Sequence, residues 1–211
     1  MKLKFIINKN YDKEMIKDMK LGEESLKYLE EQYKIGFKYL KYSQREYQIS
    51  WNEINNKFSR YVEELTGYEW FYDIYYCIVS VIHPGISNWG DEPKIVRWWC
   101  ENPYTQRRIT AHELILSHYF EIYKHYYKQY KLSNGQVWAL AEIAALASTS
   151  LTPDVKEFWP WDSFGYYTDH NYPQIVDLQK KLRNKFLSRK NFDNYIMEGI
   201  KLVKNYRNIK P

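Results

Sequence analysis

One segment of the chain, QVWALAEIAALAS at residues 136–148, is apolar almost throughout. A helix that is apolar on every side has to be buried, so this segment predicts a central helix around which the other elements pack. Ser133 and Gln136 have the spacing of a capping box, which predicts that the helix begins there. The segment therefore makes a helix-rich core the starting point for the fold.

Other segments have helical or strand periodicity. The apolar residues between positions 26 and 40 recur at steps of three and four, which predicts one amphipathic helix over residues 23–41. The alternating segment at 2–7 predicts an opening strand, and the β-branched and aromatic segments at 75–82 and 94–100 predict a β-hairpin or two neighbouring strands. Further helices are predicted at 50–67, at 103–127, from Pro173 through Ile175, Leu178 and Leu182, and at 192–204, the first with Ser50 in a capping box.

These elements predict a helix-rich α+β fold with a small antiparallel or mixed sheet, in which a helix pair follows a β-hairpin. A chain of 211 residues is long enough for one sizeable core. We expect a single domain, with an N-terminal strand and helices over 1–67, a core over 68–150, and an aromatic loop with C-terminal helices over 151–211.

Charge and composition argue against several classes of protein. The net charge is +5, but basic and acidic residues are interspersed along the helices, so no basic surface for nucleic acid is expected. No segment reaches the roughly 20 apolar residues of a membrane span, and MKLKFIINKNYDKE lacks the core of a signal peptide. Cys77 and Cys100 fit two reduced thiols. We expect a cytoplasmic protein.

His112 and Glu113 stand at the head of an apolar helical segment, ITAHELILSHYF. In the H-E-x-x-H pattern two histidines four positions apart bind one zinc ion, and the glutamate acts as general base. Here the fifth position is Leu116. His118 does not replace the missing ligand in a regular helix, because it lies about 120° around the helix from His112 and about 9 Å along it.

Glu142 is the only charged residue in the apolar segment 136–148, and an unpaired carboxylate there would cost several kcal/mol or become protonated. It therefore needs a partner, for which the candidates are a metal ion, His112, or Arg107 and Arg108.

The order of a hairpin, a His-Glu helix and a glutamate in a second helix about 30 residues later resembles the gluzincin branch of the zincin metallopeptidases, over roughly residues 75–150. The resemblance implies that His112 and Glu142 are zinc ligands and that Glu113 is the general base of amide hydrolysis. Because Leu116 stands where the family has its second histidine, it implies a degenerate site that is inactive or binds zinc weakly.

Alternatives remain at each position. Thr110 and Glu113 also match a capping box, and His112 paired with Glu142 would satisfy both groups without metal. His118 and His125 fit a polar helix edge as well as a second metal site. The 22 Tyr, the 8 Trp and the aromatic loop at 159–173 also fit a non-catalytic interaction module, of phage or mobile-element origin, that binds an unknown protein or peptide.

Overall fold

The computed structural model describes residues 1–82, 94–161 and 167–210. Within these residues it contains eight α-helices and three β-strands, which confirms the helix-rich α+β fold. The chain divides into two compact units: unit 1 is Met1–Asn56 with Tyr72–Thr110, and unit 2 is Lys57–Phe71 with Ala111–Pro211. Each unit is described separately below, and the single-domain organisation stays a prediction.

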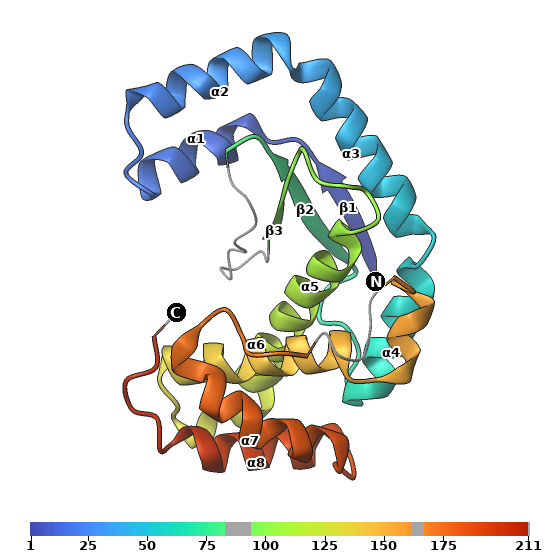
Figure 1. Cartoon of the computed structure of the whole chain (residues 1–211), viewed down its shortest axis with the longest axis vertical. Helices are drawn as coiled ribbons and strands as arrows, with labels where there is room; N and C mark the ends of the chain where they lie inside the picture. The colour runs from blue at the N-terminus through green and yellow to red at the C-terminus, as the bar shows by residue number, and fades with distance from the viewer. Residues whose placement is uncertain (83–93, 162–166, 211) are drawn as a thin grey trace. The chain divides into compact units, whose positions relative to one another are not determined.

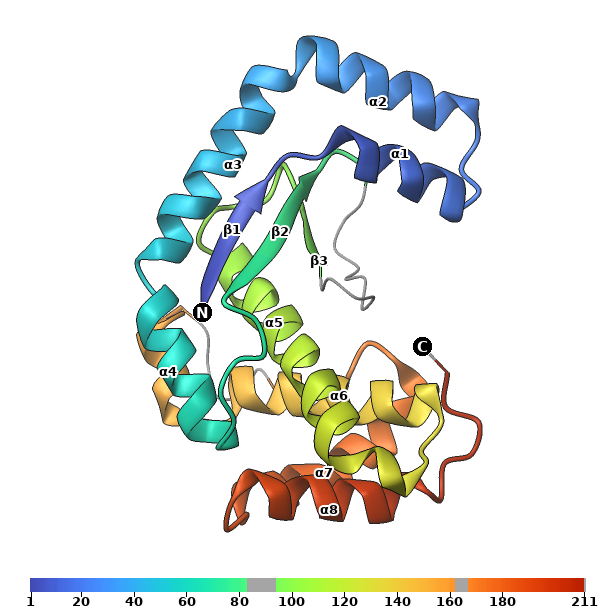
Figure 2. The same ribbon diagram turned by 180° about the vertical axis from the view of Figure 1, so that it is seen from behind.

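Unit 1 contains the sheet. Its strands β1 (Lys2–Ile6), β2 (Ile74–Ser80) and β3 (Lys94–Trp98) lie side by side in that order (Figure 2). Both pairs are parallel, with Phe5 opposite Cys77 and Cys77 opposite Ile95. Consecutive residues at the end of β2 are buried, as expected for a parallel strand that is covered on both faces.

The predicted hairpin and the antiparallel or mixed sheet are wrong, because β2 and β3 run in the same direction. Parallel neighbours need a crossover connection and cannot be joined by a tight turn. The β-branched and aromatic pattern identifies a strand but carries no information on its direction. The turn-forming residues 84–93, on which the hairpin prediction depended, lie outside the described residues.

Three helices accompany the sheet: α1 (Lys9–Asp18), α2 (Glu23–Ile35) and α3 (Phe37–Asn52). The helix predicted at 23–41 is interrupted at Gly36, so α2 and α3 are separate helices. Helix α3 also continues past Ser50, where a new helix start was predicted.

Helix α3 covers the edge of the sheet at β1. Gln48 accepts a hydrogen bond from the Phe5 backbone N–H at 2.9 Å and donates one to the Leu3 carbonyl at 3.1 Å. Gln44 donates to the Phe5 carbonyl at 2.8 Å. These amides satisfy the backbone groups of an edge strand that would otherwise be open to pairing with another chain.

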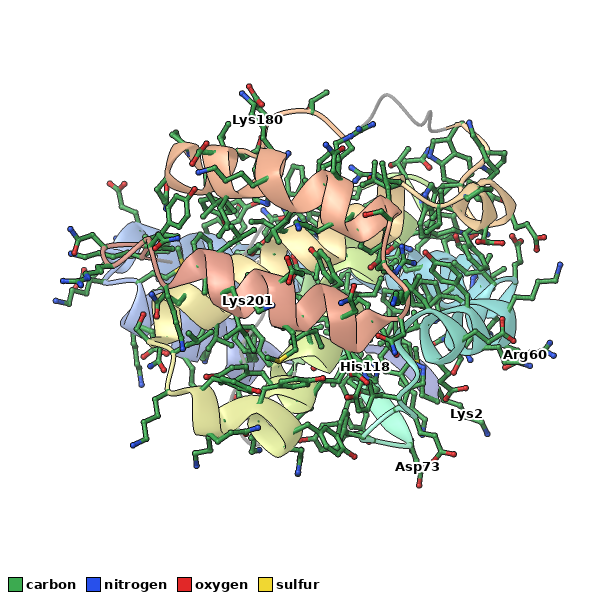
Figure 3. All side chains as sticks on the ribbon, turned by 90° about the horizontal axis from the view of Figure 1, so that it is seen from below. Lys2, Arg60, Asp73, His118, Lys180 and Lys201 are labelled. Atoms are coloured by element: carbon green, nitrogen blue, oxygen red, sulfur yellow. The ribbon has the colours of Figure 1, made fainter. Side chains whose placement is uncertain are left out.

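Five helices lie wholly or mainly in unit 2, and the first two of them, α4 (Asn55–Thr66) and α5 (Gln106–Ile122), begin in unit 1. Helix α6 lies next to α7 and α8 (Figure 1), and Figure 3 shows α7 and α8 side by side, with Lys180 on α7 and Lys201 on α8. No helix in the described residues is long and apolar enough to span a membrane. The other bounds are α6 (Asn134–Ser150), α7 (Val176–Leu187) and α8 (Phe192–Val203).

Helix α6 is buried along almost its whole length, which confirms the predicted central helix. It begins with the predicted capping box, in which the Ser133 hydroxyl accepts from the Gln136 N–H and the Gln136 side chain accepts from the Ser133 N–H. Gly199 of α8 lies directly against Leu140 of α6. The one carboxylate of this helix, that of Glu142, is therefore held within the interior of unit 2.

Candidate functional site

The carboxylate of Glu142 has three side-chain partners in unit 2. Its Oε2 atom lies 3.0 Å from Nε2 of His112 on α5 and 3.3 Å from Nε2 of His170, which precedes α7. Its Oε1 atom accepts a hydrogen bond from the indole Nε1 of Trp138 at 3.1 Å. Two imidazoles therefore share one carboxylate oxygen, and an indole binds the other.

Glu142 is ionised in this arrangement. Burial alone raises the pKa of a carboxyl group, but hydrogen bonds from His112 and His170 outweigh it and lower the pKa of Glu142 from 4.5 to about 2. An ionised carboxylate only accepts hydrogen bonds. The imidazole Nε2 atoms of both histidines therefore carry the protons and donate them to Oε2.

The backbone fixes the tautomer of His170 independently. The Tyr172 backbone N–H donates to Nδ1 of His170 at 3.2 Å, so Nδ1 accepts and carries no proton. The proton of the neutral ring is then on Nε2, facing Glu142. The turn at 170–172 thus sets both the place of this imidazole and its hydrogen-bonding direction.

An aromatic ring packs on the imidazole of His170, and a second ring packs on the first. The Tyr172 ring stacks on it with centroids 4.9 Å apart, and the same Tyr172 ring meets Trp138 edge to face, also at 4.9 Å. Burial raises the pKa of the Tyr172 phenol, and the negative charges of Glu142 and Glu113 raise it further.

Local sequence explains how these groups meet. His112 and Glu142 stand on buried helical segments of α5 and α6, whose apolar neighbours bring the two helices into the same core. His170 is in the irregular segment before Pro173, where a short 3₁₀ turn, Pro173–Ile175, leads into α7. Residues 162–166 of the aromatic loop lie outside the described residues.

The contact between His112 and Glu142 is confirmed. The side-chain partners of Glu142 are two histidines and a tryptophan, and not the arginines that were also candidates. Arg107 instead donates to the Ser50 hydroxyl at 2.7 Å and pairs with Glu53. Leu116, at the position of the family's second histidine, is almost fully buried.

His118 lies in a different environment (labelled in Figure 3). Its Nε2 is 3.2 Å from the Thr66 hydroxyl, and its ring packs 4.7 Å from Trp70 and 5.5 Å from Phe71. Burial lowers the pKa of His118 to about 3, with a smaller opposing effect of the Tyr68 backbone. The predicted polar helix edge is wrong for His118, whose side chain is completely buried.

His170, Trp138 and Tyr172 were not among the predicted site residues. His170 falls in a segment without periodicity, so no pattern places it relative to α5 or α6. Trp138 had a usable signal, because it stands four residues before Glu142, where side chains on a helix are neighbours.

The described residues, 1–82, 94–161 and 167–210, contain no group of three or more His, Cys, Asp or Glu side chains arranged to hold a metal ion. His112, Glu142 and His170 bind one another through hydrogen bonds and would have to rearrange to hold a metal ion. No protein-family model, curated protein or solved structure matches the chain.

Proposed function

We propose that unit 2 is a degenerate zincin-like domain, in which His112, Glu142 and His170 form a weak zinc site beside Glu113. The observation that carries this proposal is the convergence of two imidazoles on one carboxylate oxygen. Two imidazole nitrogens and one carboxylate oxygen are donors that zinc prefers, and three protein ligands are the usual number in catalytic zinc sites.

The positions of these residues support the same proposal. His112 and Glu113 form the first half of the H-E-x-x-H pattern, and Glu142 stands in the following helix. His170 supplies a second imidazole to the site, in place of the histidine that the family has at the position of Leu116. The likeness to zincins rests on these residues and not on the sheet, whose strands are parallel.

The hydrogen bonds of the site are the reason to expect weak binding. Nε2 of each histidine carries a proton that it donates to Glu142, and a zinc ligand has to be deprotonated at the binding atom. Zinc binding would therefore move the proton of each ring from Nε2 to Nδ1 and break the two hydrogen bonds to Glu142, and the protonated Nδ1 of His170 could no longer accept from the Tyr172 N–H. We expect affinity far below the roughly 10–16 kcal/mol of complete structural zinc sites.

When bound, zinc would supply Lewis-acid activation of water for amide hydrolysis. Glu113, next to His112 on α5, would accept the proton of the attacking water. Glu142 would be the third ligand beside the two imidazoles. With the position of the second motif histidine taken by buried Leu116, we expect little or no general peptidase activity.

Isothermal titration of the purified chain with zinc chloride at pH 7.5 tests this proposal. Glu142→Gln should abolish binding, since it removes the charge shared by the imidazoles. The matched control is Glu121→Gln, which removes another glutamate that contacts a histidine, His125, four residues later, at 3.2 Å. Absence of binding to the wild type, or equal binding by both variants, would contradict the proposal.

Restoring the family motif gives a second test. Leu116→His would place an imidazole one helical turn after His112, on nearly the same face of α5. We expect a folded Leu116→His variant to bind zinc at least tenfold more tightly than the wild type. Unchanged affinity in a folded variant would count against a zincin-like arrangement.

A second function, protein binding by unit 1, is favoured by exposed apolar residues on α2 and α3. Ile35 is 67% exposed, Tyr39 57% and Tyr42 58%, and Tyr is common at binding hot spots. Capture of a partner by the wild type and by Glu142→Gln, but not by a Tyr39→Ser, Tyr42→Ser double variant, would support this function. Capture by all three proteins would contradict it.

A further inference from the structure

The indole of Trp138 binds the carboxylate oxygen of Glu142 that the histidines do not. Trp138 and Glu142 are four residues apart on α6, and the indole Nε1 donates to Oε1 at 3.1 Å. Both side chains belong to the buried part of this helix. With Oε1 bound in this way, Oε2 is the oxygen that remains for His112 and His170.

The same indole contacts the segment that carries His170. Its ring meets Tyr172 edge to face at an interplanar angle of 82°, and Tyr172 stacks on His170 at 26°. The Tyr172 backbone N–H also binds Nδ1 of His170. Trp138 therefore contacts the site in two ways. Its N–H binds the Glu142 carboxylate, and its ring packs on Tyr172, which supports His170.

We infer that Trp138 is the positioning residue of this site: its N–H fixes the rotation of the Glu142 carboxylate so that both imidazoles bind the same oxygen. This inference rests on the proposed function for its effect on zinc and on the hydrogen bonds alone for its effect on the histidines. A glutamate side chain has several rotatable bonds. Without the indole N–H, either oxygen is able to turn toward the imidazoles, and one buried acceptor loses its donor.

Trp138→Phe tests the inference, because it removes the N–H and retains an aromatic ring beside Tyr172. The matched control is Trp159→Phe. Trp159 is fully buried in the same unit, and its Nε1 also donates at 3.1 Å, but to the Thr149 carbonyl. Both variants lose one indole hydrogen bond of the same length, so a general loss of stability should affect them similarly.

Two quantities are compared between the variants. The first is the ¹⁵N chemical shifts of the His112 and His170 imidazoles at pH 7.5 without zinc, which report which ring nitrogen is protonated. The second is zinc affinity by titration. We expect Trp138→Phe to give mixed tautomers at His112, whereas the Tyr172 N–H keeps His170 protonated at Nε2, and to weaken zinc binding roughly 10–100-fold, as is usual for loss of an outer-shell partner of a metal ligand. Trp159→Phe should change neither.

The two proposals fail separately. If the wild type does not bind zinc, the proposed function fails, and the ¹⁵N shifts still decide the role of Trp138. If the wild type binds zinc but the two variants have the same tautomers and affinity, Trp138 is not a positioning residue. If Trp138→Phe does not fold, the indole N–H proton shift of Trp138 in Glu142→Gln replaces it: a large change supports the hydrogen bond, and no change overturns the inference.

Discussion

His118 makes the stability of the protein sensitive to acid. Its side chain is completely buried between Thr66, Trp70 and Phe71, and burial lowers its pKa from 6.5 to about 3. As the pH falls below 6.5, the unfolded chain binds a proton at this histidine and the folded chain does not. The unfolded state is therefore favoured increasingly, until the pH reaches about 3.

The size of the effect follows from the width of this interval. Each pH unit between the two pKa values corresponds to about 1.36 kcal/mol. From pH 6.5 to pH 4.5 the free energy of unfolding should fall by about 3 kcal/mol because of His118. That loss is a large part of the roughly 5–15 kcal/mol by which folded domains are usually stable.

Urea unfolding at pH 7.5 and pH 4.5, followed by circular dichroism, measures this loss. The comparison protein is His118→Gln, whose side chain stays neutral over the whole interval and offers an amide to Thr66. Other groups titrate equally in both proteins, so the wild type should lose about 3 kcal/mol more than the variant. Equal losses in the two proteins would refute the claim that His118 is buried in the neutral form.

Two further predictions concern close packing and buried hydrogen bonds. Gly135→Ala would place a Cβ atom 1.9 Å from the Ile209 carbonyl oxygen, so we expect thermal unfolding to show that the free energy of unfolding falls by about 1–3 kcal/mol. Gly22→Ala, whose Cβ would have no atom within 4 Å, should change it little. Asp12→Ala would deprive Ser80 of its buried acceptor, which should lower the urea midpoint by the equivalent of about 2–4 kcal/mol; an equal effect of exposed Asp18→Ala would contradict this reasoning.

The start of a helix could be predicted where a capping box is followed by an apolar segment that packs in the core. The Ser133 capping box precedes an apolar segment and proved correct. The similar pattern at Ser50 proved wrong, because Ser50 lies inside α3, where its hydroxyl donates to the Pro103 carbonyl and accepts from Arg107. Both partners are more than 50 residues away, so no local pattern includes them.

Strand direction could not be predicted for a related reason. The sequence identifies β2 and β3 as strands, since both contain β-branched and aromatic residues. Direction depends on the path of the connection between them, and residues 83–93 of that connection lie outside the described residues.

The candidate site was predictable in part. An isolated carboxylate in an apolar helix requires a partner, and the candidates named for Glu142, a metal ion, His112, or Arg107 and Arg108, included the correct residue, His112. They did not include His170, because the irregular segment before Pro173 has no period from which to place a side chain. Burial energetics therefore predicted that Glu142 would be paired, and only the folded chain identified all of its partners.

X-ray absorption at the zinc edge, on the concentrated protein with less than one equivalent of zinc, tests the central proposal most directly. The account predicts a first shell of nitrogen and oxygen with the multiple-scattering signature of two imidazoles, which Glu142→Gln should remove. A sulfur shell, a shell of water oxygens without imidazole, or an imidazole signature unchanged in Glu142→Gln would contradict a zinc site at His112, Glu142 and His170.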